Sequence, residues 1–140
     1  MTVKKGAVPF LVGVLLLGGA APGTVSADRP EVRWVELNRE ARSWRITVTL
    51  DHHDEADYHF MDRVQIRTAD GKVLGEEDFH TPRPQAAERI TTLRDIRVPT
   101  GVTTIYVRAY CTLEGWGHAR EIDLTEPMGN GYRIRTDVDW

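Results

Sequence analysis

The chain is poor in cysteine, in clustered positive charge and in helical hydrophobic patterns, and each shortage excludes a class of protein. Its 140 residues include one cysteine, Cys111, so no disulfide can form within the chain. The 18 lysines and arginines do not cluster, and 21 residues are acidic, which argues against nucleic acid as a partner. No stretch repeats apolar residues at helical spacing, so we expect a chain without long helices.

An apolar run occurs near the N-terminus, but it has too few residues to span a bilayer. Lys4 and Lys5 precede the apolar run Ala7–Leu17, whereas a membrane span needs about 20 residues. Small residues follow as far as Ala27, which suits a signal peptidase. We therefore expect residues 1–27 to be a signal peptide and the protein to be periplasmic or secreted, without membrane contact after cleavage. The remaining chain has a net charge of −5.

Most of the remaining chain alternates apolar and polar residues, the pattern of half-buried strands. In Trp44–Leu50 every second residue is apolar, and Val64 and Ile66 continue this spacing in the next segment. Asp70 and Gly71 then suit a tight hairpin turn. Short strands with turns about every ten residues predict an all-β, immunoglobulin-like antiparallel sandwich of about seven strands. The expected strands are 32–37, 44–50, 63–67, 73–74, 90–98, 105–109 and 122–124.

We assign the predicted sandwich to residues 28–125 and treat residues 126–140 as a C-terminal extension. The extension contains Pro127 and the run Gly129–Gly131, which break regular structure. It is either a loose tail or a hairpin at the edge of a sheet. The sequence gives no indication of the oligomeric state.

The histidines of the chain gather in its central part, mostly at strand ends or in loops. They are His52, His53, His59, His80 and His118. Loops at one end of a sandwich can converge, and imidazole nitrogen together with the Cys111 thiolate suits iron, copper or zinc. The sequence therefore predicts a candidate site for one transition-metal ion.

Simpler interpretations of the same residues stay open. Cys111 continues the alternation of Ile105 and Val107, so its thiol points inward and can be an inert core residue. The segment 51–57 can be a solvated acidic loop. His80 can be an ordinary surface residue.

Two segments resemble the iron-binding motifs of superoxide reductases, the desulfoferrodoxin and neelaredoxin family. His53 and His59 lie six residues apart, flank a loop and are followed by the aromatic Phe60. The segment Ala109–Trp116 is similar to that family's Cys-Asn-x-His-Gly-x-Trp segment. The resemblance, which spans roughly residues 50–124, implies an immunoglobulin-like domain with one iron held by four histidines and an axial cysteine thiolate. It implies His53 and His59 as equatorial ligands and Cys111 as the axial, catalytic thiolate.

The chain also departs from the motifs of that family. Glu114 stands at the histidine position of the second motif, and no histidine precedes His52. His52 competes with His53 for the same ligand role, and Glu114 can complete a mixed shell. His80 and His118 are further candidate ligands.

The resemblance implies reduction of superoxide, with electrons from a separate donor because the chain lacks rubredoxin-like cysteine pairs. The alternative is a non-catalytic immunoglobulin-like binding module, similar to sulfur-carrier subunits or adhesion domains, that holds no metal. A copper-binding protein is a third hypothesis.

Overall fold

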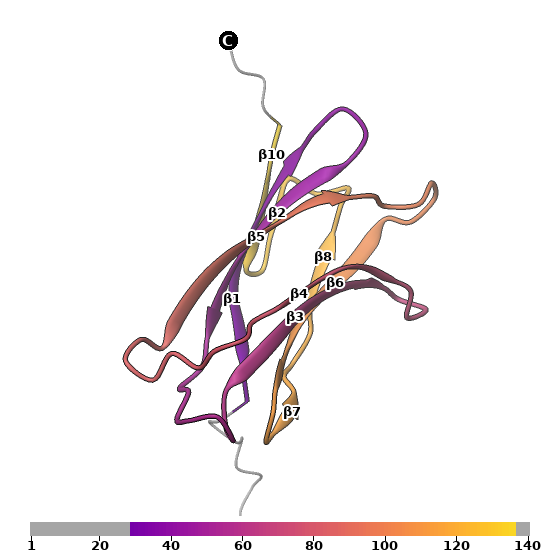
Figure 1. Cartoon of the computed structure of the whole chain (residues 1–140). Coiled ribbons are helices and arrows are strands. Elements are labelled where there is room, and N and C mark those ends of the chain that lie inside the picture. Colours follow the sequence, from indigo (N-terminus) through magenta and orange to yellow (C-terminus); the bar gives the residue numbers. More distant parts are fainter. Residues whose placement is uncertain (1–28, 137–140) are drawn as a thin grey trace, which may run out of the picture.

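The protein is seen in a computed structural model that describes residues 29–136. These residues form two β-sheets packed face to face and contain no helix (Figure 1). The all-β, immunoglobulin-like sandwich predicted from the alternating pattern is therefore confirmed. The predicted signal peptide, residues 1–27, lies outside the described residues. No helix that could cross a membrane occurs in the described part.

Within the described residues ten strands make up the two sheets, three more than the seven expected from the sequence. Two of the added strands, β7 and β9, have only two residues each, and β10 follows them near the C-terminus. The strands are β1 (Glu31–Arg39), β2 (Trp44–Asp51), β3 (Met61–Thr68), β4 (Val73–Asp78), β5 (Glu88–Ile96), β6 (Thr104–Cys111), β7 (Gly115–Trp116), β8 (Arg120–Asp123), β9 (Met128–Gly129) and β10 (Tyr132–Arg135).

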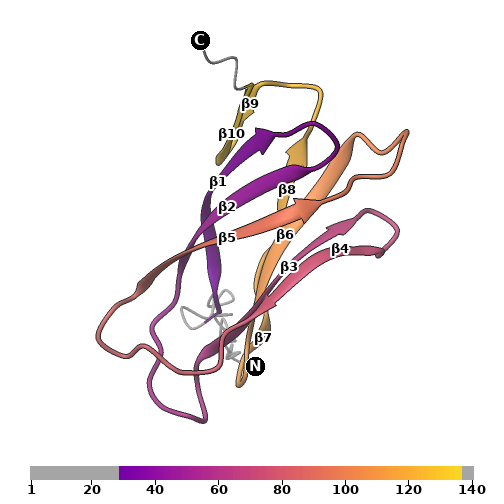
Figure 2. The same cartoon turned by 45° about the horizontal axis from the view of Figure 1, so that its top comes forward.

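The strand order brings the ends of non-consecutive segments together. One sheet has the order β5-β2-β1-β10-β9, and the other has the order β4-β3-β6-β7, with β8 also paired to β6. Figure 2 shows the two layers from a second direction. Neighbouring strands run antiparallel, except that β10 lies parallel to β1. The segment after residue 125 thus forms an edge hairpin, β9–β10, that extends the first sheet.

The core lies between the sheets and contains the apolar residues of the predicted alternation. Along β2 the inward side chains of Ile46, Val48 and Leu50 are fully buried, and the residues between them are half-buried. The inward residues of β6 continue in the same way as far as Cys111, which is 0% exposed. Alternation of period two therefore places the thiol on the interior face, as the sequence predicts.

The predicted turn between β3 and β4 is present and shows why glycine is needed there. Gly71 has a φ of +94°, a conformation that glycine adopts without steric cost. The Thr68 N–H donates to the carbonyl of Lys72 at 2.9 Å and closes the hairpin.

Replacement of a core isoleucine tests the assignment of the inward face. Ile66→Ala removes a fully buried side chain of β3, so we expect a loss of about 2–5 kcal/mol in the free energy of unfolding. Ile90→Ala makes the same chemical change at a β5 position that is 59% exposed, and we expect it to lie within about 1 kcal/mol of the wild type. Urea denaturation measures both; equal losses would contradict the assigned face.

Candidate metal centre

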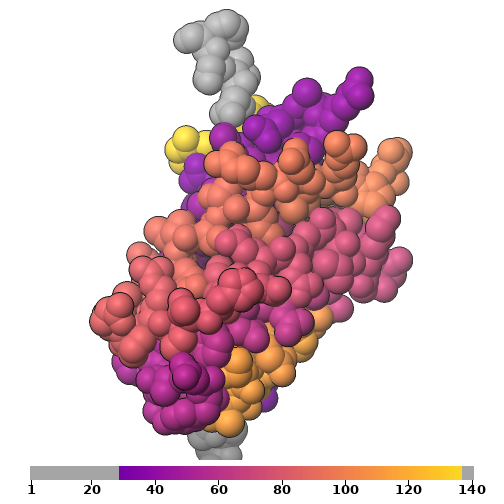
Figure 3. Space-filling view, viewed as in Figure 1, coloured from indigo at the N-terminus to yellow at the C-terminus, as the bar shows by residue number. Residues whose placement is uncertain are grey.

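Two segments that are far apart in the sequence meet at one end of the sandwich. The loop 52–60 leaves β2 and enters β3, and β6 ends at Cys111. Because β3 and β6 are antiparallel neighbours, the start of β3 and the end of β6 lie at the same end. The Thr112 N–H donates to the Phe60 carbonyl at 2.9 Å, and the Thr112 hydroxyl donates to the Tyr58 carbonyl at 3.2 Å. These bonds fix the loop against the end of β6, at the lower end of Figure 3.

The loop is itself closed by short-range backbone bonds that turn His59 inward. The Glu55 N–H donates to the His59 carbonyl at 2.9 Å, and the His59 N–H donates to the Ala56 carbonyl at 3.1 Å. The tip of the loop between these residues remains exposed, with Tyr58 64% accessible. A tight turn thus returns the chain to the interior just before β3 begins at Met61.

The described residues include a buried group of three potential metal ligands, His52, His59 and Cys111. Their ligand atoms all lie within 4.8 Å of one another. The residues are 4%, 1% and 0% exposed, respectively. The two imidazole rings stand edge to face, with centroids 5.2 Å apart. Two nitrogen donors and one sulfur donor therefore converge on a point that the protein shields from solvent.

Asp54 orients the first imidazole of this group. Its Oδ1 lies 2.6 Å from His52 Nδ1 and also accepts the Met61 N–H at 3.0 Å. Oδ2 accepts the Arg83 N–H at 2.8 Å. Burial by itself raises the pKa of Asp54, but the backbone donors of Arg83 and Met61 and the His52 ring bring that pKa below its ordinary value. Asp54 is therefore a carboxylate, and His52 donates to it through Nδ1–H.

Glu55 does the same for the second imidazole. Its Oε1 lies 2.6 Å from His59 Nδ1. An imidazole that donates through Nδ1–H to a carboxylate has Nε2 as its acceptor nitrogen. Both Nε2 atoms are buried and find no hydrogen-bond partner among residues 29–136, an arrangement that costs free energy unless another group satisfies them. Carboxylates that orient imidazoles in this way are the usual outer shell of metal sites.

Cys111 completes the group at the end of β6. Its sulfur accepts the backbone N–H of Glu114 at 3.4 Å. The chain folds back so tightly that Cys111 pairs with Gly115 of β7, where a φ of +86° requires glycine. The tight turn therefore holds the Cys111 side chain in a fixed position at the end of β6.

The structure separates the remaining predicted ligands from this group. His53 is exposed, because adjacent residues of an extended segment point in opposite directions and His52 points inward. Of the two histidines that compete for this ligand role, His52 lies in the buried group with His59 and Cys111, and His53 does not. His80 is exposed beside a shallow acidic hollow with Asp62 and Asp78.

Glu114 and His118 also lie outside the group. Glu114 is half-buried in the β6–β7 turn and contributes its backbone N–H, while its carboxylate is not among the three converging ligands. His118 is exposed in a separate groove. Sequence reasoning missed the roles of Asp54 and Glu55, although a carboxylate two or four residues from a candidate histidine was visible in the sequence.

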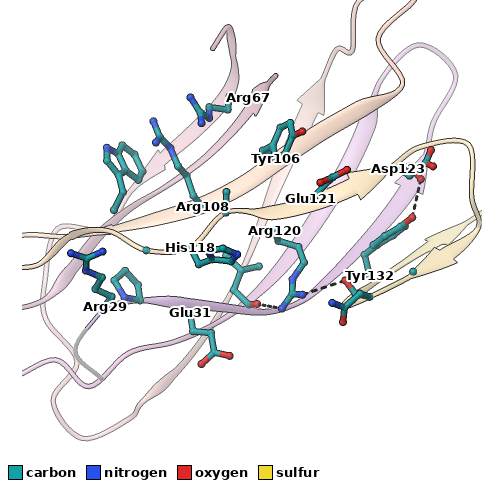
Figure 4. A pocket seen from close by; sticks show the side chains of 17 residues that line it. Arg29, Glu31, Arg67, Tyr106, Arg108, His118, Arg120, Glu121, Asp123 and Tyr132 are labelled. Atoms are coloured by element: carbon teal, nitrogen blue, oxygen red, sulfur yellow. Dashed lines mark hydrogen bonds between the residues drawn. The ribbon is translucent and has the colours of Figure 1, made fainter. Parts of the chain in front are cut away.

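The groove that contains His118 is large but has a different character. It has a volume of about 1430 Å³ and runs along β1, β8 and β10, with arginines and acidic residues along its length (Figure 4). Arg120 crosses it and donates to the carbonyls of Val32 at 2.8 Å and Asn130 at 3.3 Å. None of the three converging ligands lines the groove, so it has no direct part in the metal site.

Comparisons with known proteins give one structural likeness. No protein family model and no curated protein sequence matches the chain. Among solved structures, the chain is similar to the superoxide reductase from Nanoarchaeum equitans, with 16% sequence identity and a TM-score of 0.43. The match covers 73% of this chain and 96% of that one. Because the sequence identity is so low, the likeness bears on the fold alone, and the function depends on the side chains of the site.

Removal of the Asp54 carboxylate tests whether it organises the end of the sandwich. Asp54→Ala leaves two backbone N–H groups and the His52 ring without their acceptor. We expect a loss of at least about 1–3 kcal/mol in the free energy of unfolding. Asp57→Ala, in the exposed turn of the same loop, is the matched control and should stay close to the wild type. Chemical denaturation compares them, and an unaffected Asp54→Ala protein contradicts the assigned role.

Proposed function

We propose that this protein binds one transition-metal ion through His52 Nε2, His59 Nε2 and Cys111 Sγ, and that it serves redox chemistry outside the cytoplasm. The observation that carries the proposal has two parts: within residues 29–136 the buried Nε2 atoms of His52 and His59 have no hydrogen-bond partner, and a ligand nitrogen of each ring lies within 4.8 Å of the buried thiol. In an apolar core two such atoms cost free energy because nothing solvates them, whereas a metal ion would coordinate both.

The surrounding residues prepare the donors for a metal. Asp54 and Glu55 hold the imidazoles in the tautomer that leaves Nε2 free to coordinate. The Glu114 N–H donates to the Cys111 sulfur at 3.4 Å and helps to hold it in place. Because all three donors are buried, the protein also keeps water and competing ligands away from them.

Iron and superoxide are the metal and substrate that the sequence resemblance implies. A bound redox-active ion would supply one electron to superoxide, which with two protons gives hydrogen peroxide, and a separate donor would return that electron. The described residues bring together two imidazoles and one thiolate, whereas the family's iron centre has four imidazoles and one thiolate. The residues therefore fit a transition-metal ion, and they do not reproduce that iron centre in full. Copper suits the same three donors, and zinc binds them without redox activity.

Metal content of the purified full-length protein tests the proposal. We expect about one equivalent of a transition metal per chain by elemental analysis, and loss of most of it in Cys111→Ser and His59→Ala, because each removes a donor. His53→Ala is the matched control, since His53 is exposed next to His52; it should keep the metal.

The same measurements separate the alternatives. A metal-free wild type would contradict the metal site and favour the non-catalytic binding module, and a Cys111→Ser protein that keeps its full metal content would show that the metal is bound elsewhere. If metal is present, consumption of superoxide by the loaded protein and its loss in Cys111→Ser test the redox role.

Export is proposed from the sequence and has its own test. When the full chain is expressed in a Gram-negative bacterium, we expect it in the periplasmic fraction, starting at Asp28. Mass spectrometry of the purified protein measures this N-terminus. An intact Met1 in a cytoplasmic fraction contradicts the prediction, as the apolar run would then not act as a signal.

A further inference from the structure

The metal site proposed above supplies three donors, and a buried ion needs at least one more. Four donors are the usual number for zinc, and copper sites with two histidines and one cysteine commonly add a weak axial ligand. Within the described residues, no further histidine, cysteine or carboxylate joins the three converging ligands. The carboxylates of Asp54 and Glu55 already accept bonds from the imidazoles. The remaining donor has to be of another type.

Met61 is the methionine that is paired with one of the three ligands. It lies directly opposite Cys111 in the pairing of β3 with β6, and it is 2% exposed. The Thr112 N–H donates to Phe60, and the Met61 N–H turns away to Asp54. Met61 and Cys111 are therefore direct cross-strand neighbours, and the Cβ atoms of such a pair lie about 4.5–5.5 Å apart.

A bulge in β3 is what places Met61 on the interior face. The register shifts between Met61 and Arg63, so that Val64 lies opposite Ala109 while Met61 still lies opposite Cys111. Without the extra residue, positions 61 and 64 would point to opposite faces of the sheet. Bulges that re-aim a side chain in this way are common next to functional sites.

Met61 is also tied to the other two donors. It follows His59 by two residues, and its N–H shares the Oδ1 atom of Asp54 with the His52 ring. Any movement of Met61 therefore disturbs the elements that hold all three ligands.

We infer that the Met61 thioether is a fourth, weak donor of this site and that copper is the ion it takes. Thioether sulfur is a soft ligand that suits Cu(I) and adds little for zinc or for hard cations. Two imidazoles, one thiolate and one weak thioether form the donor set of copper sites that exchange single electrons. The inference rests on the proposed metal site and replaces iron by copper within it.

The experiment compares copper and zinc affinities of the full-length protein and its methionine variants. The metal-free proteins are titrated with Cu(I) in competition with a colorimetric Cu(I) chelator, and separately with Zn²⁺. Met61→Leu conserves side-chain volume, so the fold is kept. We expect it to weaken Cu(I) binding by roughly tenfold or more and to leave Zn²⁺ affinity nearly unchanged. Met128→Leu, at a position that is 64% exposed, is the matched control and should change neither affinity.

A spectroscopic measurement distinguishes a methionine that binds the metal from one that only packs in the core. In copper-loaded protein grown with selenomethionine, we expect a copper–selenium distance in the X-ray absorption spectrum that disappears in Met61→Leu and persists in Met128→Leu. A purely structural methionine would give no such distance.

Each contrary result identifies what has failed. If Met61→Leu binds Cu(I) as tightly as the wild type while Cys111→Ser loses it, the role of Met61 is overturned and the three-donor site stands. If Fe²⁺ displaces Cu(I) from the wild type, the assignment of copper is overturned. If the wild type binds no metal more tightly than Cys111→Ser does, the proposed function fails together with this inference.

Discussion

The end of the sandwich that carries the candidate site depends on the buried carboxylate of Asp54. This one side chain accepts hydrogen bonds from the His52 ring, from the start of β3 at Met61 and from the loop at Arg83. The Arg89 guanidinium, 4.0 Å away, compensates part of its charge. A carboxylate that is 3% exposed would be too costly to bury without these donors. Its presence therefore fixes three separate segments relative to one another.

Much of the fold could be predicted from the sequence because it follows from short-range patterns. Alternation of apolar and polar residues identified the inward faces of β2, β3 and β6, including the inward direction of Cys111. The turn at Asp70 and Gly71 was visible because few residues tolerate its geometry. The parallel pairing of β10 with β1 was not, since it joins the two ends of the domain and no local pattern encodes it.

The candidate site was predictable in its chemistry and only partly in its membership. The motif resemblance indicated His53, whereas the structure turns His52 inward. That choice depends on where β2 ends and on the Asp54 bond, both of which are tertiary features. The bulge that brings Met61 opposite Cys111 could not be predicted from the alternation of apolar and polar residues either. A bulge is defined by the pairing of β3 with β6, and that pairing is a tertiary feature.

The polar group in the core also bears on how metal binding and folding are related. Within the described part of the chain, two buried imidazole nitrogens have no hydrogen-bond partner, which lowers the stability of the protein unless an ion satisfies them. The rest of the sandwich has a continuous core, from Val32 in β1 to Tyr132 in β10, so the fold does not depend on the metal as a small zinc finger does. A metal ion bound by the folded state alone would add stability by mass action. Because the donors come from the β2–β3 loop and the end of β6, that added stability would hold together the two segments that create the site.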